Sequence, residues 1–282
     1  MKSGRRKTGA RRIAHIAGIG VAGACAAIAA LALLLILGYI VVKGAGAINI
    51  EFLTQLPRPV GVSGGGVANG IVGSIITVAI ATVLALPIGV STGIYLALFG
   101  RGTFAEIVRF LSDVLSGVPS IAIGLFAYNL LVAPFKHFSA ISAAFALMVL
   151  MLPLLIRTSE QAVRSVPTAL MEGALALGMT VRRSTMRIVL PAARPAIITA
   201  LLLGIARIAG ETAPLLFTAF GTQFWEVNPR NPIAMLPLQI FTYAISPYQS
   251  WQQQAWGGAL LLVLAVLVLN IGARFALSRQ PR

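Results

Sequence analysis

Six long apolar runs dominate the sequence, and they constrain the fold more than any other feature. A bilayer core of about 30 Å is crossed by roughly 20 apolar residues in a helix, and each run is about that long. Only 10% of the residues are charged and 58% are hydrophobic, whereas a soluble domain carries about 25% charged residues. The predicted membrane-spanning helices cover residues 16–42, 70–99, 108–134, 138–156, 195–220 and 255–275.

The runs lack the short alternating pattern of barrel strands, so the sequence predicts an all-α, polytopic membrane protein with six transmembrane helices. We expect a tail over 1–15, a spanning domain over 16–275 with one large loop at 158–194, and a tail over 276–282. The first run exceeds the roughly 7–15 apolar residues of a signal peptide, so a retained helix is predicted. Cys25, the single cysteine, excludes an intramolecular disulfide.

Basic residues are distributed unequally between the two sides of the predicted spans. A net charge of +15 would suggest nucleic acid in a soluble protein. Here the basic residues crowd both tails and the loops after the second and fourth runs, while the opposite loops hold only Lys43, Arg58, Lys136 and Arg230. By the positive-inside rule, the crowded side is cytoplasmic. The sequence therefore predicts an inner-membrane protein surrounded by lipid, with both termini cytoplasmic and no nucleic-acid partner.

Small residues recur at helical spacing in and beside the first two runs. They are Ala14, Gly18 and Ala22, then Gly66 with Gly70, and Gly89 with Gly93. Such spacing lets membrane helices approach closely. The pattern predicts packing within one bundle, with a subunit interface as the alternative.

The loop over 158–194 contains a helix–turn–helix pattern. Pro167 suits the first turn of a helix, and Gly178 suits the left-handed cap that ends it. A second short helix over 182–190 is predicted to end at Pro191. Leu170, Ala174 and Leu177 form an apolar stripe on the first helix, so a cytoplasmic protein is expected to cover it. An amphipathic helix lying on the membrane surface is the alternative.

Glu172-Gly-Ala-Leu-Ala-Leu-Gly178, followed after nine residues by Ile188-Val-Leu-Pro191, resembles the EAA loop of ABC importer permeases. One position departs from that motif, because Gly173 replaces its first alanine. The resemblance implies that this loop docks on an ATP-binding subunit through Glu172, Gly173, Ala174, Gly178, Ile188, Leu190 and Pro191. The chain has no G-x-x-x-x-G-K-[ST] sequence, so we expect ATP and Mg²⁺ on partner subunits. We expect this chain to hold no cofactor, catalytic residue or metal ligand.

Arg207 and Glu211 lie near the middle of the fifth run, where an ionised side chain costs about 2.5–3.5 kcal/mol. Four residues apart, they are predicted to be neighbours on one helix face. Pro214 lacks the N–H that would reach Gly210, which predicts a kink beside the pair. Ionisable residues at this depth indicate a transport pathway. The alternative is a structural ion pair that fixes subunit packing.

Residues 206–218, ARIAGETAPLLFT, closely resemble the signature of the A-type permease subunits of phosphate ABC importers. Residues 117–125, GVPSIAIGL, are similar to a segment shared by both permease subunits of those importers. The resemblance implies a type I ABC importer permease-like (MetI-like) architecture. It also implies a substrate pathway at Arg207 and Glu211, and we expect Thr212, which lies beside the pair, to belong to the same pathway. An arginine suits that role because its fork of donors matches phosphate oxygens.

The same resemblance implies three kinds of partner: a second homologous permease subunit, two ATP-binding cassette subunits and a periplasmic phosphate-binding protein. Two alternatives remain open. One is an ABC permease for another oxyanion, molybdate or sulfate, and the other is a secondary transporter that needs no ATPase. An aromatic group around the last external loop predicts an interfacial belt, and the resemblance implies, as the alternative, a contact with the binding protein. The members of this group are Phe224, Trp225, Tyr243, Tyr248, Trp251 and Trp256.

Overall fold

The computed structural model describes the backbone of residues 4–60, 62 and 64–278, and the side chains of residues 15–60, 62 and 64–272. Within these ranges the chain is helical apart from loops and one isolated bridge between Phe220 and Ile233. The helices are α1 (Gly4–Gly44), α2 (Ile50–Thr54), α3 (Ala68–Leu98), α4 (Thr103–Gly117), α5 (Ser120–Ala127), α6 (Ala133–Phe135), α7 (Ala140–Arg164), α8 (Thr168–Ala176), α9 (Val181–Ser184), α10 (Leu190–Ala209), α11 (Leu215–Thr218), α12 (Leu236–Ala244) and α13 (Gln249–Ser278). Three helical turns of other pitch join them: η1 (Ala45–Ala47), η2 (Tyr128–Val132) and η3 (Thr185–Val189).

Five helices in the described part of the chain are long and apolar enough to cross a membrane. They are His15–Ala47, Ala68–Leu98, Ala140–Arg164, Val181–Ala209 and Gln249–Gly272. α4 and the helix that follows it pass the same test together, bent by 104°. Taken as one span, this bent pair brings the count to six. The predicted all-α, multi-span fold is confirmed, but the third span is broken rather than straight.

The predicted bounds of the fourth and fifth spans were wrong. α7 continues eight residues past the predicted end at 156, to Arg164. The next long helix starts at Val181, not 195, and stops at Ala209, not 220. Hydropathy marks where a helix touches lipid, whereas hydrogen bonding and charge pairing decide where it ends. Glu160 and Arg164, for example, pair one turn apart and extend α7 beyond its apolar part.

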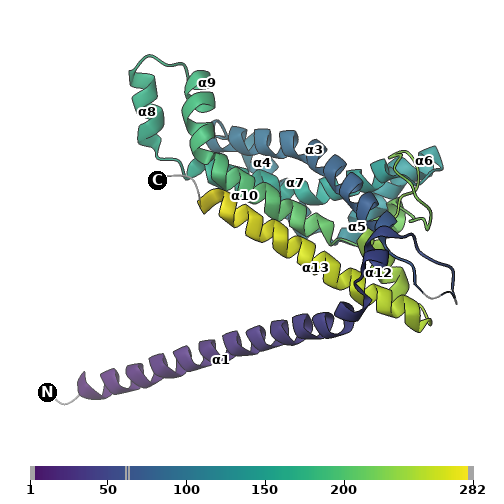
Figure 1. The fold of residues 1–282 in the computed structure, drawn as a ribbon. Helices are drawn as coiled ribbons and strands as arrows, with labels where there is room; N and C mark the ends of the chain where they lie inside the picture. The colour runs from purple at the N-terminus through teal and green to yellow at the C-terminus, as the bar shows by residue number, and fades with distance from the viewer. Residues whose placement is uncertain (1–3, 61, 63, 279–282) are drawn as a thin grey trace.

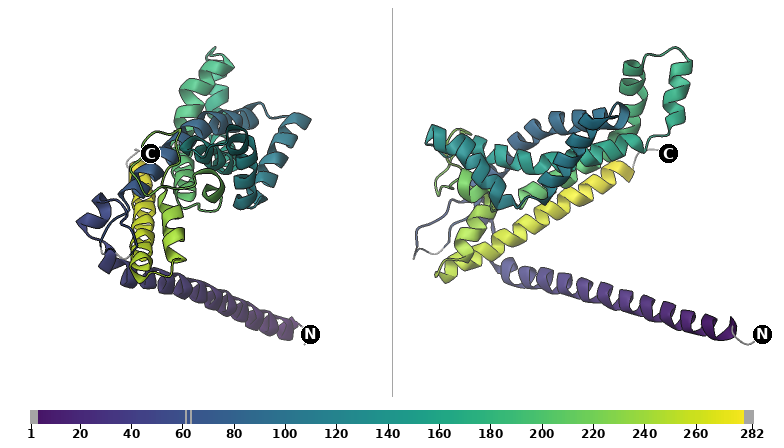
Figure 2. Two further views of the ribbon diagram at one scale, coloured as in Figure 1. Left: turned by 90° about the vertical axis from the view of Figure 1, so that its right-hand side faces the viewer. Right: turned by 180° about the vertical axis from the view of Figure 1, so that it is seen from behind.

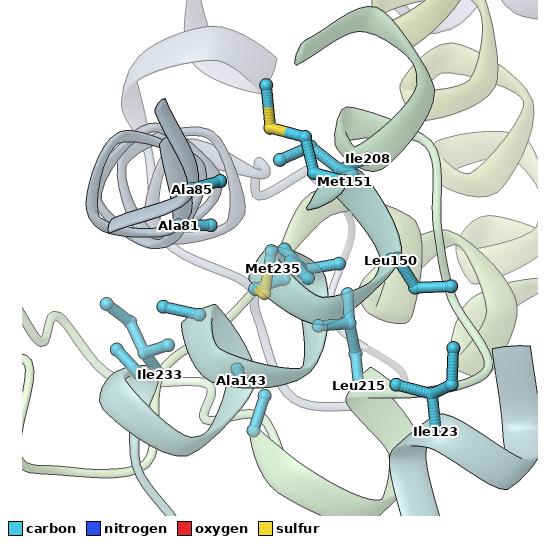
Figure 3. Close-up of a cluster of buried hydrophobic side chains, with 14 of the residues drawn as sticks. Ala81, Ala85, Ile123, Ala143, Leu150, Met151, Ile208, Leu215, Ile233 and Met235 are labelled. Atoms are coloured by element: carbon cyan, nitrogen blue, oxygen red, sulfur yellow. The ribbon is translucent and has the colours of Figure 1, made fainter. Parts of the chain in front are cut away.

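α7 lies at the centre of the bundle. Its Ala143 and Met151 belong to one buried cluster with Ala81 and Ala85 of α3 and Ile208 of α10 (Figure 3). Ile123, Leu215, Ile233 and Met235 close the same cluster from α5, α11 and the loop before α12. Side chains from five separate stretches of sequence therefore meet on one central helix.

Glycines set the spacing between α3 and α7. A Cβ at Gly89 would come within 2.6 Å of the Leu155 Cβ, and one at Gly93 within 2.6 Å of the Ser159 Cβ. Distances under about 3 Å leave no room for a side chain. The predicted close approach of small residues is confirmed here.

α1 extends away from the rest of the bundle (Figures 1 and 2). It is held near its C-terminal end, where a Cβ at Gly44 would lie 2.6 Å from the Trp256 carbonyl of α13. Gly18 has no atom within 4 Å, and Ile28 and Leu34 are 68% and 66% exposed. The prediction that Gly18 packs within this chain's own bundle is therefore wrong.

The α8–α9 hairpin projects beyond the spanning helices, at the same end of the molecule as the start of α1 and the end of α13 (Figure 1). α6 and α12 lie at the opposite end. The hairpin therefore lies on the side of the molecule at which α1 begins and α13 ends.

Candidate functional site

The fifth predicted span is interrupted in the middle of the resembling segment. α10 ends at Ala209, with Gly210 as its cap, and α11 begins only after Pro214. At the break the backbone hydrogen bonds span three residues instead of four. The N–H of Gly210 donates to the Arg207 carbonyl at 3.4 Å, and the N–H of Glu211 donates to the Ile208 carbonyl at 3.3 Å. The predicted kink is a full break over residues 210–214.

Arg207 and Glu211 do not share a helix face, so that part of the prediction was wrong. Glu211 lies beyond the helix end, because Gly210 caps α10 and Pro214 cannot supply the next backbone donor. Among the ion pairs of the described residues, none includes either side chain. Arg207 is exposed, and Glu211 and Thr212 are half-buried. An arginine, a carboxylate and a hydroxyl therefore lie at or next to the break, and the two charged side chains form no ion pair with each other.

The depth of Arg207 follows from the packing of α10 on α7. A Cβ at Gly204 would meet the Met151 Cε at 2.8 Å, close to the midpoint of α7. Arg207 is one turn further along α10, so it lies within the spanning region. Leu203, 49% exposed, shares its outward face, while Ile208 points into the core. An arginine at this depth thus faces out of the chain.

A second break lies beside the first. α4 ends at Gly117, and α5 starts at Ser120 after the bend at Val118 and Pro119. Gly124 of α5 faces the other break so closely that a Cβ there would lie 2.6 Å from the Pro214 Cα. The two sequence segments that resemble phosphate permeases are therefore in direct contact, a relationship that sequence reasoning did not predict.

The α8–α9 hairpin begins as predicted. Pro167 precedes the first turn of α8, and Gly178 ends it with φ of 79°. The N–H of Met179 donates to the Ala174 carbonyl at 3.1 Å, and the N–H of Gly178 to Leu175 at 2.9 Å. These two bonds form a Schellman motif, which requires the left-handed residue that glycine adopts at low cost.

The outward face of α8 differs from the predicted stripe. Leu170 and Leu177 are 46% and 86% exposed, but Ala174 is buried inside the hairpin. Next to it, Met171 contacts the Ser184 hydroxyl of α9. Ala174 therefore cannot be covered by a partner. Glu172 and Gly173 are both exposed, and a Cβ at Gly173 would meet no atom within 4 Å.

The predicted helix end at Pro191 was wrong. α9, η3 and α10 follow one another without a break, and Pro191 lies in the first turn of α10. The wide turn η3, closed by the N–H of Leu190 on the Thr185 carbonyl, precedes the proline and accommodates its missing donor. Ile188 is half-buried. Leu190 packs in a cluster with Val163 of α7 at the root of the hairpin.

A cavity and a buried tyrosine lie away from the two breaks. A cavity of about 390 Å³ lies at the opposite end, between α12 and the loop around Thr222. In it, burial raises the pKa of Tyr243, whose ring stacks on Trp251 at 4.6 Å. Tyr243 is 3% exposed and thus does not belong to an interfacial belt.

An ionic cluster around Glu160 was not predicted, although the i, i+4 spacing between Glu160 and Arg164 was visible in the sequence.

Comparison with known proteins decides the family. The model of the binding-protein-dependent transport system inner membrane component matches residues 89–279. The chain belongs to this family, among its PstA-type permeases. It is 42% identical to the phosphate transport system permease protein PstA of Yersinia pestis, over 99% of this chain and 95% of that protein. It is 46% identical to the PstA of Haemophilus influenzae, over 85% of each chain.

The fold of this family is also found in a solved transporter. A chain of the inward-facing MetNI methionine ABC transporter matches with a TM-score of 0.62 and 18% identity, over 76% of this chain and 97% of that one. The predicted MetI-like permease architecture is confirmed. Family membership and the apolar helices make the protein a multi-pass inner-membrane transport subunit. The cytoplasmic placement of its termini stays a prediction.

Proposed function

We propose that this chain is a transmembrane subunit of an ATP-driven importer of inorganic phosphate. The relatives named as phosphate transport permeases, at 42% identity over 99% of the chain, support the substrate. The structural observation that carries the proposal is Arg207, exposed within the spanning region and without an ion-pair partner among the described residues.

An exposed arginine at this depth is unstable against lipid, because it costs about 2.5–3.5 kcal/mol or more there. A second, homologous permease chain covering this face would remove the contact with lipid and enclose a pathway. Arg207, Glu211 and Thr212 then line one wall of that pathway. Since Glu211 is not paired with Arg207, the guanidinium is available to an anion.

The chemistry of the break suits a polyvalent oxyanion. A phosphate dianion meets a barrier of order 20 kcal/mol on leaving water for a low-dielectric core. The guanidinium fork offsets part of that barrier, because it donates to two oxygens at once. Glu211 repels the anion and keeps it from binding too tightly, which a pathway requires for release. Thr212 adds a neutral hydroxyl.

The α8–α9 hairpin is the part of this chain that couples it to ATP hydrolysis on a partner subunit. Leu170, Gly173 and Leu177 form an exposed row at i, i+3 and i+7 on a helix that projects from the bundle. We infer that this row, with Glu172 at its side, docks on an ATP-binding cassette subunit that also holds Mg²⁺. Two such subunits, one for each permease chain, and a periplasmic phosphate-binding protein complete the transporter, with both termini of this chain in the cytoplasm.

Uptake of labelled phosphate by the reconstituted complex tests the function. The expected result is ATP-dependent uptake that a tenfold excess of sulfate or molybdate leaves largely unchanged. If molybdate or sulfate out-competes phosphate, the substrate is another oxyanion. The matched control is this chain alone in the same vesicles. Gradient-driven phosphate flux through it would indicate a secondary transporter and contradict the proposal.

A further inference from the structure

An ionic cluster joins α4 and α7 just before the α8 hairpin. Its centre is Glu160 of α7, whose side chain is only 5% exposed. Its Oε1 accepts a hydrogen bond from the Arg109 Nε of α4 at 2.8 Å and pairs with an Nη of Arg164, also at 2.8 Å. An Nη of Arg157 lies 3.7 Å from the other carboxylate oxygen. A carboxylate this buried is stable only while its partners stay in place.

Arg109 extends the cluster to the end of α3. Its Nη2 donates to the carbonyl of Leu96 at 2.9 Å and to that of Gly100 at 3.2 Å. The last carbonyls of a helix lack partners inside the helix, so a donor from outside stabilises them. One guanidinium on α4 therefore holds both the end of α3 and the buried carboxylate of α7.

A second, outer pair connects the same two helices. Arg157 of α7 makes two contacts with the carboxylate of Asp113 on α4, one of them from Nε to Oδ1 at 2.9 Å. The Asp113 side chain is 59% exposed. Exposed pairs contribute little because water screens them. The interior connection between α4 and α7 therefore depends on Glu160.

Packing at the same level ties α3 to α7. A Cβ at Gly93 would lie 2.9 Å from the backbone nitrogen of Glu160. α7 ends only four residues later, at Arg164, and α8 starts at Thr168. The cluster thus lies about one helical turn from the root of the hairpin.

We propose that Glu160 is the positioning residue that transmits movement of the α8 hairpin to α3 and α4. The inference rests on the proposed docking of α8 on an ATP-binding subunit. A displaced hairpin moves the end of α7, and through Glu160 and Arg109 the ends of α4 and α3 move with it. α4 continues through the bend at Val118 into α5, where Gly124 contacts Pro214 at the far end of the break that follows Arg207. The ionic cluster therefore begins a continuous route from the hairpin to the pathway.

Glu160→Gln tests this role in the complete complex in vesicles, with phosphate imported per ATP hydrolysed as the readout. The substitution keeps the shape of the side chain and removes its charge. We expect the complex to assemble and the ratio to fall about fivefold or more, the range of ordinary coupling between sites. Glu106→Gln is the matched control, because Glu106 is exposed on α4 and makes no ion pair among the described residues. Its ratio should equal that of the wild type.

An assembled Glu160→Gln complex with an unchanged ratio would overturn the inference and leave Glu160 as a static contact. If the variant fails to assemble, Arg109→Lys decides, since lysine keeps the charge but not the fork that holds three acceptors. A reduced ratio in that variant supports the role, and a normal ratio overturns it. If the wild-type complex imports another oxyanion, the proposed substrate fails, and the ratio is then measured with the imported anion.

Discussion

Gly124 and Pro214 bring the two broken spans into contact, because a Cβ at Gly124 would lie only 2.6 Å from the Cα of Pro214. The two residues are ninety positions apart in the sequence. Backbone meets backbone at this point, so neither break can shift without the other. Arg207 lies about one turn before the second break, on the last turn of α10.

Gly124→Ala is expected to destabilise the protein by about 1–3 kcal/mol, the usual effect of forcing extra volume into a packed site. The obstructing atom belongs to the backbone and cannot rotate away. Unfolding of the purified chain in detergent measures the change. Gly117→Ala is the control in the same segment, because its Cβ would meet no atom within 4 Å. Equal stability of the two variants would contradict the contact.

Arg207→Gln is expected to lower phosphate uptake about 10- to 100-fold, the equivalent of one charge-assisted hydrogen bond. The complex should still assemble, since the side chain is exposed and forms no ion pair among the described residues. Uptake and complex yield are measured on the same preparation. Loss of assembly instead would favour a structural role in subunit packing.

Two glycines of the hairpin are expected to respond in opposite directions. Gly178→Ala should destabilise the end of α8 by roughly 1–2 kcal/mol, because its φ of 79° is left-handed. Gly173→Ala should stabilise α8 by up to about 1 kcal/mol, since that position is helical and open. Hydrogen exchange of the α8 amides reports both. A gain in protection for Gly178→Ala would contradict the Schellman motif.

Acid is expected to loosen the loop before α12 through Glu226. The N–H groups of Asn228 and Val227 and the Asn231 amide donate to its carboxylate and lower its pKa. Because the folded pKa lies below 4.5, the unfolded loop binds more protons, and the stabilisation is lost as pH falls through the folded pKa. Proteolysis of the loop at about pH 6 and pH 3 measures it. Glu226→Gln should abolish the difference.

Much of the fold was predictable because its signals are local. Apolar runs located the spans, and Pro167 and Gly178 marked the ends of α8, since each acts through its own backbone. The candidate site was predictable only as a set of residues. Sequence spacing placed Arg207 and Glu211 on one helix face, but the helix ends between them.

The sequence by itself determined that the chain spans a membrane, and where an ionisable group lies within a span, because hydrophobicity and charge belong to single residues. Only the tertiary structure decided where the spans break and which groups meet. A broken helix is stable only where distant neighbours fill or satisfy the gap, as Gly124 does against Pro214. In the same way, the end of α3 is stabilised from a distant segment, because Arg109 donates hydrogen bonds to the carbonyls of Leu96 and Gly100. Such compensation depends on contacts between remote segments, which no local pattern contains.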